Sequence, residues 1–112
     1  GQWVPSFGKN SVPIINPATG KEIERCPLGT SEDVARAVAA AKAAFTTWKD
    51  VPVIDRVQYL FMLKTLLEAN LDEIAKLVTK EHGKTFLEAK ASTRRGMQMV
   101  ETATGMPSFQ QG

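Results

Sequence analysis

The residues with the clearest capacity to bind an anion are the adjacent Arg94 and Arg95, near the middle of a predicted helix. At helical spacing, Arg95 lies one turn from Ala91 and from Met99, so its neighbours are small or soft side chains. A planar guanidinium holds a carboxylate through two parallel hydrogen bonds, which a lysine cannot reproduce. The alternative is a solvated arginine whose stem covers apolar surface, and the residues alone favour this alternative.

The sequence Gly83-Lys84-Thr85 matches the end of a phosphate-binding loop. The complete loop requires another glycine five positions before Gly83, and this chain has Val78 there. A helix that ends at Gly83 and a new helix capped by Thr85 account for the same residues. We therefore expect a helix stop and start here, and no nucleotide site.

Cys26 and His82 are the only cysteine and the only histidine of the chain. Cys26 precedes Pro27 on a predicted strand with no base suggested nearby, so a small buried thiol is the favoured interpretation. His82 precedes Gly83, where a positive charge suits the C-terminus of a helix. We expect no catalytic, cofactor-binding or metal-binding residue in this chain. A single cysteine suits a reducing compartment, either a bacterial cytoplasm or a mitochondrial matrix.

The composition is that of an ordinary globular chain. Its 112 residues carry 14 Lys and Arg against 12 Asp and Glu, and 43% are hydrophobic. This balance excludes a disordered tail and a basic nucleic-acid-binding arm. The longest wholly apolar run, residues 59–63, is far shorter than the roughly 20 residues of a membrane span. We expect neither a nucleic acid nor a membrane as a partner.

The elements that would position these residues follow from turn signals and periodicity. Residues 1–30 are predicted to be extended and residues 31–112 helical, because residues 31–104 contain only one proline, Pro52. The turn sequence Pro17-Ala18-Thr19-Gly20 predicts a β-hairpin between strands at residues 12–16 and 23–27. Trp3 and Val4 are predicted to form a further strand.

About four helices are predicted. Thr30 and Asp33 cap the first, which ends before Pro52, and the second runs from about residue 55 to 70. The third is capped by Asn70 and Glu73, directs Ile74, Leu77 and Val78 inward, and ends at Gly83. The fourth is capped by Thr85 and Glu88, ends at Gly105 and Pro107, and has one seam of Phe86, Ala89, Thr93, Gly96, Val100 and Ala103.

Several literal strings and their order resemble the amino-terminal part of aldehyde dehydrogenases. They are Ile15-Asn16-Pro17-Ala18-Thr19-Gly20, Ala43-Ala44-Phe45-x-x-Trp48 and Glu81-His82-Gly83-Lys84-Thr85. Within that family, Arg95-Gly96-x-x-x-Val100-Glu101-x-Ala103-x-Gly105-x-Pro107, ending in Gly112, resembles the CoA-acylating branch that oxidises methylmalonate semialdehyde.

The resemblance implies an α+β fragment of an α/β aldehyde dehydrogenase fold. Residues 1–30 and 31–112 would together be an incomplete part of its N-terminal cofactor-binding domain. A full-length parent would use NAD and coenzyme A, act on a small semialdehyde, and release propionyl-CoA or acetyl-CoA with carbon dioxide. It would be a homo-oligomer. The 112 residues alone are expected to bind no cofactor and to be inactive.

The resemblance also changes the interpretation of Arg95. In this branch, the arginine of the Arg-Gly pair lines the substrate tunnel and is implicated in holding the substrate carboxylate. Arg95-Gly96 matches that pair, and Met99 would form part of the tunnel wall. Two alternatives stay open: another aldehyde dehydrogenase, for succinate semialdehyde or general aldehydes, and a freestanding helical protein-interaction module.

Overall fold

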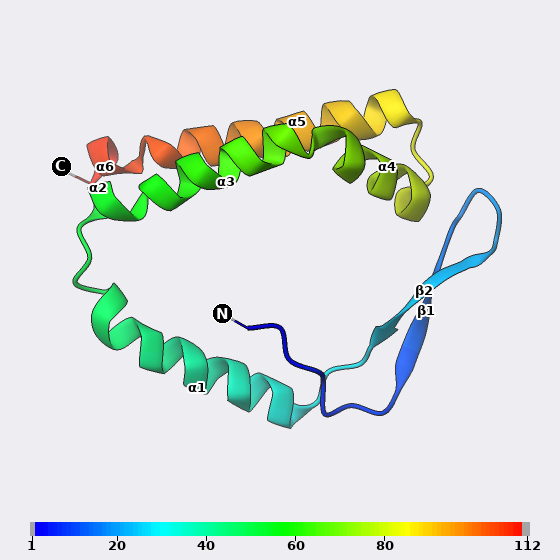
Figure 1. Cartoon of the computed structure of the whole chain (residues 1–112), viewed down its shortest axis with the longest axis horizontal. Helices are drawn as coiled ribbons and strands as arrows, with labels where there is room; N and C mark the ends of the chain where they lie inside the picture. Colours follow the sequence, from blue (N-terminus) through cyan, green and yellow to red (C-terminus); the bar gives the residue numbers. More distant parts are fainter. Residues whose placement is uncertain (1, 111–112) are drawn as a thin grey trace. The chain divides into compact units, whose positions relative to one another are not determined.

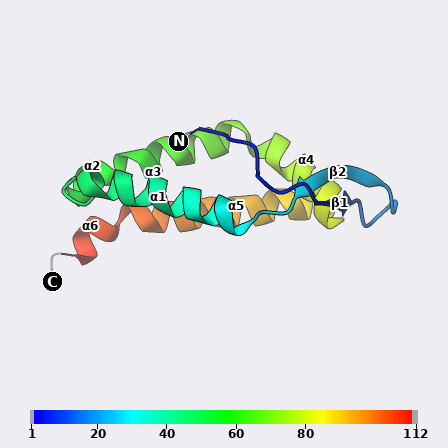
Figure 2. The ribbon, with the colours of Figure 1, turned by 90° about the horizontal axis from the view of Figure 1, so that it is seen from below.

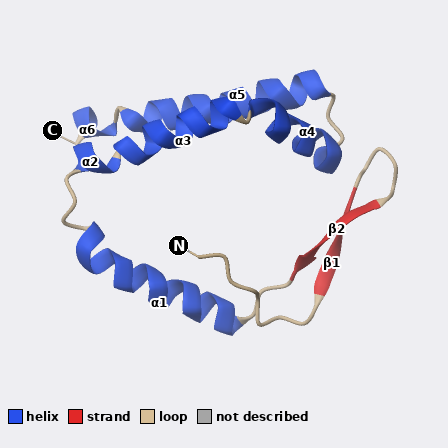
Figure 3. Ribbon diagram, viewed as in Figure 1, coloured by secondary structure: helices blue, strands red, loops and turns tan. Residues whose placement is uncertain are grey.

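The computed structural model describes residues 2–110, so Gly112 lies outside the described residues. The chain forms two compact units, which divide between Asp50 and Val51. The first unit holds a β-hairpin and a long helix, and the second is helical throughout its described residues (Figures 1 and 3). The first helix therefore belongs to the same unit as the hairpin.

The hairpin consists of β1 (Ser11–Ile15) and β2 (Glu22–Pro27), which pair antiparallel as predicted (Figure 3). The turn is stabilised from within, because the Asn16 carboxamide oxygen accepts a hydrogen bond from the Ala18 N–H at 2.9 Å. Gly20 has a φ of 68°, a conformation that glycine adopts at no steric cost. The predicted turn is thus confirmed.

The predicted strand at Trp3 and Val4 is wrong. Both residues lie outside regular structure and are exposed. A strand needs a neighbour for its backbone N–H and C=O groups, and among residues 2–110 the only strand pairing is that of β1 with β2.

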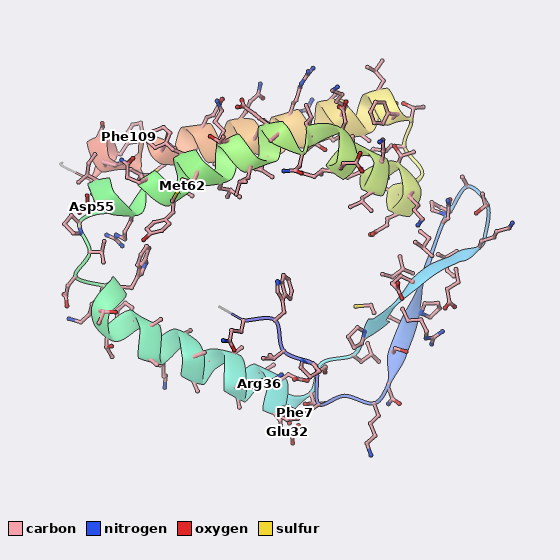
Figure 4. All side chains as sticks on the ribbon, in the orientation of Figure 1. Phe7, Glu32, Arg36, Asp55, Met62 and Phe109 are labelled. Carbon is pink, nitrogen blue, oxygen red and sulfur yellow. The ribbon has the colours of Figure 1, made fainter. Side chains whose placement is uncertain are left out.

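Helix α1 (Ser31–Trp48) begins with the predicted capping box. The Thr30 hydroxyl accepts a hydrogen bond from the Asp33 N–H at 3.3 Å, and Asp33 Oδ2 accepts one from the Thr30 N–H at 2.9 Å. The Asp33 carboxylate also holds the segment before the hairpin, because the Ser6 hydroxyl and the Phe7 N–H donate to it at 2.6 and 3.1 Å. The Arg36 guanidinium stacks 4.4 Å from the Phe7 ring centroid, and Figure 4 shows the two side chains at the start of α1. One carboxylate thereby joins the N-terminal segment to the helix.

These hydrogen bonds hold the pKa of Asp33 well below its usual range, the largest cause being the Ser6 hydroxyl and the next the Thr30 N–H. A depressed pKa stabilises the folded state above the unfolded-state pKa of about 3.9, and this stabilisation is lost as the pH falls below it. We expect the Phe7 and Thr30 amides to be protected from hydrogen exchange at pH 5 and to lose protection progressively below about pH 4. Amide exchange measured by NMR checks this. In Asp33→Asn, protection should be weak at both pH values, and an unchanged pH profile in that variant would contradict the assignment.

The second unit contains four-residue helices at both ends and three longer helices between them. They are α2 (Val53–Arg56), α3 (Gln58–Ala69), α4 (Leu71–His82), α5 (Phe86–Thr104) and α6 (Met106–Phe109). Both α3 and α4 pack against α5, and α3 lies alongside α5 in both views (Figures 1 and 2). Among the described residues, no helix has the length and apolar character needed to cross a membrane.

The buried residues of this unit are mostly small. Ala75 of α4 and Ala89 of α5 are fully buried, and Val57 and Met97 are 5% and 7% exposed. Small side chains let neighbouring backbones approach closely, which explains the buried alanines where α4 packs on α5. Leu77, predicted to point inward, is 57% exposed, because the buried face of α4 is centred on Ala75 instead. Met97 was absent from the predicted seam, yet it is the large side chain that α5 buries.

The second predicted helix differs from the structure in its start and its continuity. Pro52 accepts the first backbone hydrogen bonds, from Asp55 and Arg56, so the helix begins at Val53. It is then interrupted at Val57, whose carbonyl accepts from the Leu60 N–H at 2.9 Å, a three-residue spacing that tightens the turn.

Two predicted helix ends also differ. Asn70 does not cap α4, because its side-chain N–H donates back to the Leu66 carbonyl at 2.8 Å, at the end of α3. Gly105 ends α5 as predicted, but α6 follows it. Pro107 lies in the first turn of α6, where a missing N–H leaves no hydrogen bond unmade.

Candidate functional site

Arg95 is one of the residues that line an open depression of about 320 Å³ on one face of α5. Its lining residues are Lys84, Glu88, Ala91, Ser92 and Arg95. Ser92 and Ala91 precede Arg95 by three and four residues, and Glu88 precedes it by seven. These are the spacings that place side chains on one face of a helix. The depression is therefore built from a single helix and from Lys84, which precedes it.

The stop-and-cap arrangement predicted for residues 83–85 positions the start of this face. Gly83 has a φ of 79°, and its N–H donates to the Thr79 carbonyl at 3.0 Å. The Thr85 hydroxyl and N–H both donate to Glu88 Oε2, at 2.8 and 3.1 Å, and the Thr85 hydroxyl accepts from the Glu88 N–H. The helix-cap interpretation of these residues is confirmed.

The depression is positively charged and has one carboxylate. Glu88 is committed to the Thr85 hydroxyl and backbone, and these hydrogen bonds lower the pKa of Glu88. Lys84 Nζ donates to the Ser92 hydroxyl at 3.0 Å. Within residues 2–110, the Arg95 side chain takes part in no hydrogen bond or ion pair, so the N–H donors of its guanidinium are available to a ligand. Two cations against one engaged carboxylate suit a small anion.

The depression includes only one of the three residues of α5 discussed above, which are Arg94, Arg95 and Met99. Arg95 lines the depression, whereas its neighbour Arg94 does not. Met99 follows Arg95 by one turn, is 62% exposed, and is not one of the lining residues. A role for Met99 in a tunnel wall stays a prediction.

Sequence reasoning missed Lys84 and Ser92 as members of this site. Ser92 carries a signal, since it lies three residues before Arg95 on the predicted helix. Lys84 has no such sequence signal, because it precedes the helix and helical spacing does not relate it to Arg95. Its place in the depression depends on the direction that its side chain takes from the turn.

Cys26 is exposed, so the expectation of a buried thiol is wrong. Five of the six residues of β2 are exposed and only Ile23 is partly covered. The residues of the first unit therefore leave this strand open on both faces. His82 is the last residue of α4 and is exposed, as a helix-end residue. Among the described residues, no group of three or more His, Cys, Asp and Glu side chains is arranged to hold a metal ion.

The chain belongs to the aldehyde dehydrogenase family, which it matches over residues 3–112. Malonate-semialdehyde dehydrogenase 1 of Geobacillus kaustophilus is 46% identical to it over 112 residues, which are all of this chain and 23% of that protein. A malonate-semialdehyde dehydrogenase of Bacillus cereus is 47% identical over the same length and the same share. The chain therefore spans about a quarter of the length of these relatives.

Solved structures give the same fold. Methylmalonate-semialdehyde dehydrogenase from Oceanimonas doudoroffii superposes with a TM-score of 0.90 and 36% identity, over 95% of this chain and 22% of that one. A putative methylmalonate-semialdehyde dehydrogenase from Sinorhizobium meliloti, crystallised with NAD, gives a TM-score of 0.91 and 33% identity, over 96% and 22%. The predicted fold class, a hairpin followed by helices of an aldehyde dehydrogenase, is confirmed. The second predicted helix is divided into α2 and α3, and the short helix α6 is an addition to the four helices predicted.

Proposed function

We propose that the full-length protein containing this chain is an NAD-dependent, CoA-acylating dehydrogenase of malonate semialdehyde or methylmalonate semialdehyde. The observation that carries the proposal is the depression around Arg95, an unpaired guanidinium in a positively charged setting. A semialdehyde acid has a carboxylate at the end opposite its reacting carbonyl. An anion-binding residue that holds this carboxylate fixes the direction in which the aldehyde group points. The names of the relatives support the same substrate class.

In this proposal, the residues of the chain bind and orient the substrate. Arg95 donates two parallel hydrogen bonds to the substrate carboxylate, and helix α5 provides a rigid mount for that contact. The substrate carboxylate takes the place of water around the Arg95 guanidinium. This contact fixes the orientation of the substrate, which lowers the entropic cost of the reaction at its aldehyde group elsewhere in the enzyme. Met99, one turn further along α5, would contribute apolar surface to the tunnel.

The described residues do not fit an NAD site. Their only strands are the antiparallel pair β1 and β2, and Gly83-Lys84-Thr85 forms a helix stop and cap. A dinucleotide site uses a glycine-rich turn between a parallel strand and a helix. We assign NAD and coenzyme A to residues beyond this chain, and we derive no step through either group.

The parent enzyme is proposed to be a homo-oligomer, and the bacterial relatives favour the cytoplasm as its location. Exposed apolar side chains on α3 support a protein surface that is covered in the full-length enzyme. They are Phe61, Met62, Leu63 and Leu66.

The proposal is tested by supplying the purified full-length protein with malonate semialdehyde, NAD and coenzyme A. We expect one acetyl-CoA, one carbon dioxide and one NADH for each semialdehyde consumed. This ratio follows because oxidation of the aldehyde reduces one NAD, the acyl group is transferred to the thiol of coenzyme A, and the carboxyl group is lost as carbon dioxide. Mass spectrometry of the acyl-CoA and absorbance of NADH measure the ratio. Formation of malonate without acetyl-CoA would contradict the CoA-acylating assignment and favour an ordinary aldehyde dehydrogenase.

A further inference from the structure

We propose that Lys84 is a second cation of the Arg95 carboxylate site and that Ser92 positions its ammonium group. The proposal rests on the proposed function, because it names a further residue for the same substrate. Its basis is the placement of Lys84, Ser92 and Arg95 in one depression, together with the charges that surround them.

The geometry brings the Lys84 ammonium along the helix toward Arg95. Lys84 lies 11 residues before Arg95, but its Nζ is 3.0 Å from the Ser92 hydroxyl oxygen. Ser92 precedes Arg95 by three residues, which corresponds to about 4.5 Å along the axis of an α-helix. The flexible stem of Lys84 therefore carries its charge over about two turns of α5, to within one turn of Arg95.

The partner of Lys84 distinguishes it from the other lysines of this unit that make side-chain hydrogen bonds or ion pairs. Lys64, Lys76 and Lys90 each contact a carboxylate, at 3.0, 2.7 and 2.5 Å. Among the residues that the structure describes, Lys84 has only the neutral Ser92 hydroxyl as a hydrogen-bond partner. An ammonium group has three donors, so two of them stay available.

Among the described residues, the one carboxylate in the depression forms no ion pair with this ammonium, although the Lys84 charge contributes to lowering the pKa of Glu88. Glu88 Oε2 already accepts two hydrogen bonds from Thr85. The lining thus has two cations and one anion, a net charge of +1. A small monocarboxylate completes the balance, with two donors from Arg95 and at least one from Lys84. The ligand class is a short-chain carboxylate, such as the acidic end of malonate semialdehyde.

The test uses steady-state kinetics of the full-length enzyme with malonate semialdehyde and with propanal, which has no carboxylate. Lys84→Met should raise KM for malonate semialdehyde about 10-fold, with kcat nearly unchanged, because one charge-assisted hydrogen bond is lost. Propanal kinetics should not change. Lys84→Arg keeps the charge and should retain most of the preference for the acidic substrate. Lys80→Met, a lysine outside the depression, is the matched control and should behave as wild type.

Ser92 acts through Lys84, so its variants should show a smaller effect of the same kind. Ser92→Ala should raise KM for malonate semialdehyde about 3-fold, and Ser92→Thr, which keeps the hydroxyl, should restore it. Titration calorimetry with acetoacetate, in which a methyl group replaces the aldehyde hydrogen of malonate semialdehyde, should show the same order of affinities.

The outcomes separate this proposal from the proposed function. If Lys84→Met affects both substrates equally or neither, while Arg95→Ala selectively weakens the acidic one, the role of Lys84 is overturned and the proposed function stands. If neither variant distinguishes the two substrates, the carboxylate site itself is overturned. A loss of selectivity in Lys84→Arg as large as in Lys84→Met would show that charge is not what Lys84 contributes, and would also overturn the proposal.

Discussion

Arg95→Ala in the full-length protein is expected to lower kcat/KM for malonate semialdehyde by about 30-fold to 1,000-fold. The variant loses a bidentate, charge-assisted contact and leaves the substrate carboxylate without its partner. Arg95→Lys should recover only part of the loss, because an ammonium cannot form two parallel hydrogen bonds with a carboxylate. The measurement is the ratio of kcat/KM for malonate semialdehyde to that for propanal.

The neighbouring Arg94 is the matched control for this prediction. It lies on the same helix and has the same charge, but it does not line the depression. Arg94→Ala should therefore leave the substrate ratio close to that of wild type. An equal loss of activity toward both aldehydes in Arg95→Ala, or a larger selective loss in Arg94→Ala, would show that the carboxylate contact is assigned to the wrong residue.

The 112-residue polypeptide by itself is expected to form no NADH from malonate semialdehyde, a complete loss relative to the full-length enzyme. Its described residues include no glycine-rich turn between a parallel strand and a helix, which is the element that holds a dinucleotide. Its one cysteine is on an exposed hairpin. Absorbance at the NADH band, with NAD and coenzyme A both in excess, measures the activity.

Cys26 provides the control for that experiment. In the purified polypeptide, any slow turnover should be the same in the wild-type chain and in Cys26→Ala, because the thiol has no base to activate it. Among residues 2–110, the Cys26 Sγ has one hydrogen-bond partner, the Pro27 carbonyl oxygen at 3.7 Å. NADH formation that depends on Cys26 would contradict the assignment of catalysis to residues beyond this chain.

The starts of two helices could be predicted because the forces at these points are local. Thr30 with Asp33 and Thr85 with Glu88 each satisfy backbone N–H groups within four consecutive residues. The left-handed turn at Gly83 is equally local, since it depends on the absence of a Cβ atom. The hairpin turn at residues 17–20 belongs to the same class.

The same reasoning failed where a prediction depended on what a side chain meets in space. Asn70 has the residue type of a helix cap, but one residue separates α3 from α4, and its amide donates backward to Leu66. Leu77 is more apolar than Ala75, yet Ala75 is buried, because a small residue permits the close approach of α5. Cys26 is exposed because the first unit covers neither face of β2.

The candidate site divides in the same way. The amino-acid sequence by itself determined that Arg95 is on a helix that begins at a capping box, and that the chain resembles aldehyde dehydrogenases. Only the tertiary structure decided that Lys84 belongs beside Arg95, because the path of a flexible side chain from a turn has no period in the sequence. Helical spacing is a property of the backbone, whereas the placement of the Lys84 ammonium depends on the Ser92 hydroxyl.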